Sequence, residues 1–181
     1  MEDLKLIQVL RFFLENPYEE VYLRELAKKM KISPYAIKKY ADLLVKESII
    51  QEEKKANLRY FKSNTTNLFY KYLKIAFAMQ LIHKSMVVEY LKKNIANVSA
   101  IILFGSVAKG ENTKESDLDI VIIGKEKSIN LTNVEDRIGT TINTHIFSWS
   151  EWNKKAKNDK AFYHEVVNYG IPLFGELPLV Q

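Results

Sequence analysis

A glycine–serine pair, Gly105–Ser106, precedes two aspartates, Asp117 and Asp119, that are separated by a single leucine. The residues before the pair and after the second aspartate are rich in aliphatic and β-branched side chains, which predict two strands. Side chains two positions apart on a strand share a face, so we expect both carboxylates to lie together. A cation between them would relieve their repulsion, and Mg²⁺ or Mn²⁺ prefers such oxygen ligands.

The turn between the two strands has a second predicted role. Gly105 can adopt backbone conformations that a side chain disfavours, so the turn can direct backbone N–H groups outward. Together with the Ser106 hydroxyl, these groups suit the phosphates of a nucleoside triphosphate (NTP). Lys109 could add a positive charge near the same phosphates. We therefore expect Gly105, Ser106 and Lys109 to bind the nucleotide, and Asp117 and Asp119 to bind the metal and carry the chemistry.

The spacing of these residues resembles the signature of the polymerase-β-like nucleotidyltransferase superfamily, and is closest to its minimal archaeal and bacterial members. Lys109-Gly110-Glu111 and Ser116 stand where such proteins show a basic–glycine–acid run and a serine before the first aspartate. The closing residues, 162–176, are similar to the C-terminal helix and strand of that family. The resemblance covers residues 98–176. It implies a small α/β domain that binds Mg²⁺ and an NTP and transfers a nucleoside monophosphate (NMP) to a hydroxyl group.

One part of that signature is missing. Catalytic members of the superfamily usually hold a third carboxylate on the neighbouring strand, but the matching strand, 141–147, contains no acid. Its same-face residues are Thr141, Asn143 and His145, and a strand histidine is more often structural than a base. Loop and helix residues that could substitute, without a spacing argument for any of them, are Glu111, Glu135 and Asp136. Metal and nucleotide binding are therefore favoured over turnover.

Residues 1–64 predict three helices followed by a hairpin. The apolar residues of the first two helices recur at helical spacing, and Ser33-Pro34 supplies an N-cap and an initial proline for the third. Two short strands, 49–53 and 59–63, follow. This order resembles a winged helix-turn-helix domain, in which the third helix enters the major groove of DNA.

That resemblance places several residues on a DNA-facing surface. They are Tyr35, Lys38 and Lys39 on the third helix, and Lys54, Lys55 and Arg59 on the wing. Lysine and arginine at such places suit contacts with backbone phosphates. Winged helices also serve as protein-interaction modules, and the neighbouring acids Asp42, Glu52 and Glu53 dilute the basic surface.

Residues 65–97 contain neither glycine nor proline and predict one long helix. Its apolar residues alternate steps of four and three, which is typical of a helix that packs along another helix. The residues of this stripe are Leu68, Tyr72, Ile75, Met79, Ile82 and Met86. We expect a homodimer through this helix, and packing within the chain is the alternative.

Composition restricts the remaining possibilities. The 181 residues are 47% hydrophobic and 27% charged, which predicts a folded protein. The basic excess lies in residues 1–97, so a polyanion-binding surface is expected there. The absence of cysteine excludes disulfides and cysteine-bound zinc. Acidic residues follow Met1 where a signal peptide has basic ones, and the apolar runs are too short for a membrane helix, so we expect a cytoplasmic protein without a membrane partner.

We therefore expect an α+β protein with three parts. A winged helix-turn-helix would occupy residues 1–64, a linking and dimerisation helix 65–97, and a nucleotidyltransferase-like α/β domain 98–181. Two functions remain open. The chain is either a Mg²⁺-dependent nucleotidyltransferase that also binds double-stranded DNA, or a transcriptional regulator whose nucleotidyltransferase-like domain is a non-catalytic nucleotide sensor or scaffold.

Overall fold

This computed structural model describes residues 2–125 and 129–180. They contain two β-sheets. One is an antiparallel sheet of three strands in the order β1-β3-β2, and the other is a mixed sheet of four strands in the order β6-β5-β4-β7. The chain divides into two compact units, with the boundary between Lys74 and Ile75. Each unit contains one of the sheets and buries its own set of hydrophobic side chains.

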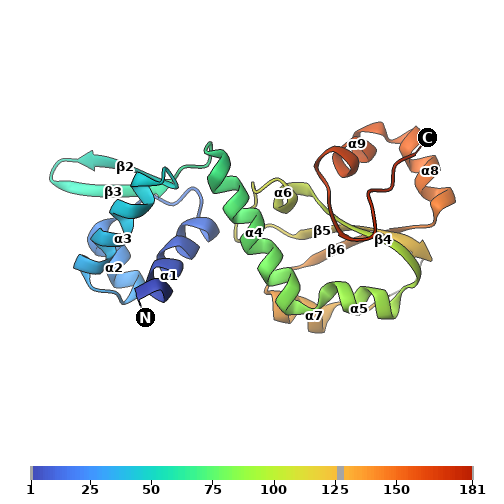
Figure 1. The fold of residues 1–181 in the computed structure, drawn as a ribbon, viewed down its shortest axis with the longest axis horizontal. Helices are drawn as coiled ribbons and strands as arrows, with labels where there is room; N and C mark the ends of the chain where they lie inside the picture. Colours follow the sequence, from blue (N-terminus) through green and yellow to red (C-terminus); the bar gives the residue numbers. More distant parts are fainter. Residues whose placement is uncertain (1, 126–128, 181) are drawn as a thin grey trace. The chain divides into compact units, whose positions relative to one another are not determined.

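The first unit combines helices with the smaller sheet (Figure 1). Its elements are α1 (Glu2–Glu15), β1 (Val21–Tyr22), α2 (Leu23–Met30), α3 (Pro34–Lys46), β2 (Ile50–Lys55) and β3 (Leu58–Ser63). The predicted helices and hairpin are present, and β1 is an additional strand that pairs with β3. The Ser33 hydroxyl accepts a hydrogen bond from the Ala36 N–H at 3.3 Å, which confirms the predicted N-cap of α3.

The second unit is built around the mixed sheet, and α4 crosses the boundary into it. The elements from α4 onward are α4 (Leu68–Ser85), α5 (Val87–Asn94), β4 (Ala96–Phe104), α6 (Gly105–Ala108), β5 (Leu118–Lys125), α7 (Thr132–Ile138), β6 (Ile142–Phe147), α8 (Trp149–Asn158), α9 (Lys160–Tyr169) and β7 (Ile171–Phe174). β4 pairs antiparallel with both β5 and β7, whereas β6 runs parallel to β5. The predicted alternation of strands and helices is therefore confirmed.

The prediction of one long linking helix is wrong, because the structure breaks it at Met86. This residue separates α4 from α5 and has a left-handed φ of 58°. The buried Ser85 hydroxyl donates to the Ile82 carbonyl oxygen at 2.7 Å and accepts from the Val87 N–H at 3.3 Å. These side-chain bonds replace part of the helical hydrogen-bond ladder, so the helix can end without glycine or proline.

The apolar stripe predicted for dimerisation is divided between exposed and buried positions. Leu68, Tyr72 and Met86 are exposed, but Ile82 is buried in the core of the second unit. The stripe therefore does not form one continuous exposed face. No helix in the described part of the chain, α4 included, is long and apolar enough to cross a membrane.

The mixed sheet is covered on both faces. Alternate residues of β4 enter different cores: Ile101 packs with residues of α5 and α7, and Ile102 with residues of α8 and α9. Figure 1 shows these two pairs of helices on opposite faces of the sheet. On β5, Val121 packs in the core beneath α8 and α9, so Asp119 and Asp117, two and four positions earlier, lie on that same face.

Candidate active site

Three neighbouring strands bring the predicted site residues together at one end of the mixed sheet. Phe104, the last residue of β4, pairs with Asp119 of β5, and Asp119 pairs with Asn143 of β6. Gly105 directly follows Phe104 and begins α6. Because β4 is antiparallel to β5 while β6 is parallel, the end of β4 meets the starts of the other two strands. The sheet therefore places the turn, the aspartates and Asn143 side by side.

Gly105 makes a close approach that a side chain would prevent. Its φ is 73°, in the left-handed region that favours glycine. A β-carbon built at Gly105 would lie 2.5 Å from Oδ2 of Asp119, which is far inside van der Waals contact. The Asp119 carboxylate therefore lies directly against the backbone of the turn.

The side chain of Asn143 connects the two aspartates. Its Nδ2 donates hydrogen bonds to Oδ2 of Asp117 at 3.2 Å and to Oδ1 of Asp119 at 3.1 Å. One nitrogen can reach both carboxylates only because they are directed into the same space. The partial positive charge of the amide also offsets some of their repulsion.

Ser116 fixes the chain just before the first aspartate. Its hydroxyl accepts a hydrogen bond from the Thr113 N–H at 2.8 Å, and its carbonyl oxygen accepts one from the Thr140 hydroxyl at 2.9 Å. The second bond ties the entrance of β5 to the segment that leads into β6. Asp117 and Asn143 are therefore held close to each other by backbone and side-chain contacts together.

Lys109 does not bind the paired carboxylates. Its Nζ lies 2.7 Å from Oε1 of Glu165 on α9 and 5.6 Å from the centroid of the Tyr169 ring. The Glu165 carboxylate raises the pKa of Lys109. Lys109 therefore connects α6 to α9, while Ser106 at the start of α6 is partly exposed.

The structure supplies no third acid beside the aspartates within its described residues. The Glu135 carboxylate accepts a hydrogen bond from the backbone N–H of Ile142 at 2.9 Å. The His145 ring makes T-shaped contacts with the rings of Phe104 and Phe162. No group of three or more His, Cys, Asp and Glu side chains in the described ranges could hold a metal ion.

The oxygen donors that are present fit a divalent cation that is shared with a phosphate ligand. Asp117 and Asp119 supply two carboxylates directed into one space, whereas Asn143 directs its amide nitrogen toward them. Mg²⁺ commonly takes one or two carboxylates and completes its shell with waters and substrate phosphates. The side chains therefore suit a metal–nucleotide complex better than a metal ion held by protein alone.

The six residues predicted to face DNA all lie on the first unit, and Lys55 and Arg59 among them form ion pairs with its acids. Those on α3 are exposed, Tyr35 to 81%, and Lys54 is exposed on the hairpin. Lys55 instead has its Nζ 2.5 Å from a Glu20 carboxylate oxygen and 3.7 Å from one of Glu53. Its charge is thus paired with acids of the same unit.

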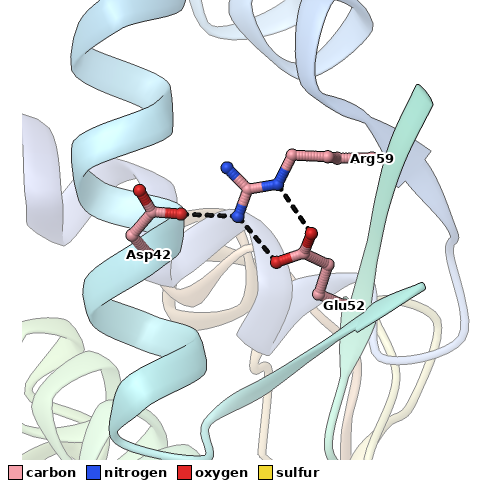
Figure 2. A network of polar contacts seen from close by, with 3 residues as sticks. All are labelled: Asp42, Glu52 and Arg59. Atoms are coloured by element: carbon pink, nitrogen blue, oxygen red, sulfur yellow. Dashed lines mark hydrogen bonds and ion pairs between the residues drawn. The ribbon is translucent and has the colours of Figure 1, made fainter. Parts of the chain in front are cut away.

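Arg59 is bound by two carboxylates from different elements (Figure 2). Its Nε and Nη2 donate to the two carboxylate oxygens of Glu52 at 2.7 and 2.6 Å, and Nη2 also donates to Asp42 at 2.5 Å. Asp42 lies on α3 and Glu52 on β2, so Arg59 connects the hairpin to the helix. The hydrogen bonds that Arg59 donates, together with its charge, lower the pKa of Glu52.

A mixed sheet with the glycine turn and paired aspartates at one end defines a nucleotidyltransferase domain. Residues 85–177 match the family described as "Polymerase beta, Nucleotidyltransferase". The chain belongs to this family. It is also 37% identical over 81 residues to a "Putative protein adenylyltransferase" of Methanocaldococcus jannaschii, a match that covers 42% of this chain and 79% of that protein.

Two solved toxin–antitoxin structures are similar to the chain at low TM-scores. One contains AMP-PNP, has a TM-score of 0.40 and 20% sequence identity, and matches 51% of this chain and 73% of that chain. The other is a variant of the MntA–HpeT complex, with a TM-score of 0.36 and 20% identity over 50% of this chain and 70% of that chain.

We predict that Gly105→Ala lowers the free energy of unfolding by about 2–3 kcal/mol. The left-handed φ alone costs about 1 kcal/mol, and the new Cβ also overlaps the Asp119 carboxylate. Gly139→Ala is the matched control, because Gly139 has a φ of 81° with no atom of the described chain within 4 Å of such a Cβ. Urea denaturation measures both variants. Equal losses would contradict the contact between Gly105 and Asp119.

We predict that Arg59→Met lowers the free energy of unfolding by about 1 kcal/mol at neutral pH. Arg59 lowers the folded-state pKa of Glu52, so this stabilisation is present above the unfolded pKa and is lost as pH falls through the lower folded value. The difference between wild type and variant should therefore begin to narrow as pH falls below about 4.3, the ordinary pKa of glutamate, and close below the lower folded value.

Urea unfolding at neutral and acidic pH measures this difference. Arg11→Met, which removes an exposed ion pair with Glu15, is the control and should cost about 0.5 kcal/mol or less. A wild-type advantage over Arg59→Met that is as large in acid as at neutral pH would show that the carboxylates are not its source.

Proposed function

We propose that this chain transfers an NMP from a magnesium–NTP complex to a hydroxyl group, and that its first unit is a winged helix-turn-helix that binds duplex DNA. The observation that carries the enzymatic part is the contact between Asp119 and the backbone at Gly105. It sets the carboxylate that we assign to the metal beside the turn that we assign to the phosphates, and nucleotidyl transfer requires the two to be close. Membership of the polymerase β nucleotidyltransferase family supports the same class of reaction.

The residues of the site would divide the work. Asp117 and Asp119 would hold Mg²⁺, which when bound neutralises phosphate charge and helps to align the reacting groups. The first backbone N–H groups of α6 lack helical acceptors and, with the Ser106 hydroxyl, would bind phosphate oxygens. The acceptor oxygen bonds to the α-phosphorus as the bond to the bridging oxygen breaks and pyrophosphate leaves. The hydroxyl proton passes to solvent or to Asp117, the more exposed aspartate.

We further propose ATP as the nucleotide and a protein hydroxyl as the acceptor. The support is the similarity to the M. jannaschii protein, whose name describes adenylyl transfer to protein. The aligned region covers most of that protein. The second unit of this chain contains the glycine turn and both aspartates.

Asn143 favours a second function. It occupies the position beside Asp119 where the superfamily resemblance calls for an acid, and an amide cannot accept the proton of a reacting hydroxyl. In this alternative the second unit binds Mg²⁺–NTP without transferring the nucleotide. The chain would then be a transcriptional regulator whose DNA affinity responds to the bound nucleotide.

Labelling experiments separate the two functions. With α-labelled ATP, Mg²⁺ and cell extract as a source of acceptors, the wild-type chain should label protein. Asp117→Asn and Asp119→Asn should each reduce the label at least about tenfold, since even the loss of an outer-shell partner at a metal site costs that much. Glu89→Gln, which alters an exposed acid on α5, should leave the label unchanged.

Calorimetry with a non-hydrolysable ATP analogue and Mg²⁺ completes that test. Binding without labelling by the wild-type chain would support the nucleotide-sensing function. If the chain neither bound the analogue nor labelled protein, both functions of the second unit would be excluded.

The DNA-binding part of the proposal is supported by the arrangement of α1–α3 and the hairpin. Lysines exposed on α3 and at the tip of the hairpin, including Lys38, Lys39 and Lys54, suit contacts with phosphates. Arg59 is bound by Glu52 and Asp42, so we assign it the role of positioning the hairpin against α3.

We predict that affinity for duplex DNA falls steeply as salt increases from about 50 to 200 mM, because each phosphate contact releases counterions. Lys38→Gln should reduce the slope of log K against log salt by about 1. Arg59→Met should lower the affinity and leave the slope unchanged. Fluorescence anisotropy measures both quantities. A flat wild-type response would exclude DNA binding, and a lower slope for Arg59→Met would mean that Arg59 itself contacts phosphate.

A further inference from the structure

Helix α9 contacts both ends of the segment Phe104–Lys109, which we call the phosphate turn. At the first end, the rings of Phe162 and Phe104 meet edge to face with their centroids 5.4 Å apart. At the second end, Lys109 binds the Glu165 carboxylate and lies over the Tyr169 ring. The two ends of the turn are therefore held by one helix.

The three α9 residues in these contacts share one face of the helix. Phe162, Glu165 and Tyr169 are spaced by three and four positions, which places them in a row. Val166, which also faces the sheet, is fully buried in the core that contains Phe104. Because that core fixes α9 against the sheet, the helix can determine where the phosphate turn lies.

We propose that Glu165 is a positioning residue for nucleotide binding. By holding Lys109, it clamps the phosphate turn to α9 and keeps the backbone at Gly105 against Asp119. This inference rests on the proposed function, since it takes the turn as the site of the phosphates. It also changes the role of Lys109 from the predicted phosphate ligand to one half of a clamp.

The accessibility of the pair is consistent with that role. The side chains of Lys109 and Glu165 are 31% and 30% exposed, so the ion pair is partly shielded from water. Glu111 adds a weaker electrostatic interaction with Lys109, but Glu165 is the dominant partner. The ammonium group is therefore already held by α9 before a nucleotide arrives.

The alternative role for Lys109 predicts the opposite effect for one substitution. If Lys109 served the phosphates directly, Glu165 would compete with the nucleotide for it, and Glu165→Gln would strengthen nucleotide binding. If the pair is a clamp, Glu165→Gln loosens the turn and weakens binding. The sign of the change in Kd therefore distinguishes the two roles.

The experiment is calorimetry on the full chain with a non-hydrolysable ATP analogue and Mg²⁺. We expect Glu165→Gln to raise Kd by about twofold to fivefold, the range for a partly exposed ion pair. The reversed pair, Lys109→Glu with Glu165→Lys, should return Kd to within about twofold of wild type. Glu15→Gln removes an exposed ion pair in the first unit and should leave Kd unchanged.

A second measurement distinguishes a displaced turn from a general loss of structure. Urea unfolding makes this distinction. Glu165→Gln should move the unfolding midpoint no further than Glu15→Gln does, because each removes one partly exposed ion pair. If Glu165→Gln lowered the midpoint much further, the ion pair would be holding the domain rather than the turn, and the proposal would be wrong.

The remaining outcomes are equally decisive. An unchanged or lower Kd for Glu165→Gln overturns the positioning role and leaves the proposed function intact. A reversed pair that binds no better than Lys109→Glu alone shows that Lys109 contacts the phosphates, which also overturns the clamp. A wild-type chain that does not bind the ATP analogue overturns the proposed function together with this inference.

Discussion

The candidate site depends on the absence of a side chain at Gly105, which is a glycine. The backbone turns there with a positive φ, and the Asp119 carboxylate occupies the space that any larger residue would fill. The register of β4 against β5 fixes this contact, because Phe104 and Asp119 are paired. Both strands are buried on both faces, so close packing in two cores supports the contact.

Local sequence signals predict the glycine turn and the two aspartates well. An apolar strand ending at Gly105 and a second strand carrying Asp117 and Asp119 are each visible within a few residues, and strand periodicity alone puts both carboxylates on one face. Local sequence signals do not predict the pairing of β6 with β5. It puts Asn143 beside Asp119, and only the folded sheet shows its amide donating to both aspartates.

The remaining differences come from contacts between residues far apart in the chain. Lys109 and Arg59 both look like free basic side chains in the sequence, but each finds carboxylates on another element of its own unit. The break at Met86 has the same origin, because it depends on a buried serine hydroxyl rather than on glycine or proline. Composition and periodicity carry no information about such partners.

Asn143 also determines how the second unit behaves when no ion is bound. Its amide gives the two aspartates a neutral partner from within the protein, whereas an acid at the same position would bring three negative charges together. Such a cluster would make folding depend on a cation, as it does in structural metal sites. With the amide in place, the two carboxylates are hydrogen-bonded within the protein without a cation between them, so we expect the stability of this domain to depend little on divalent ions.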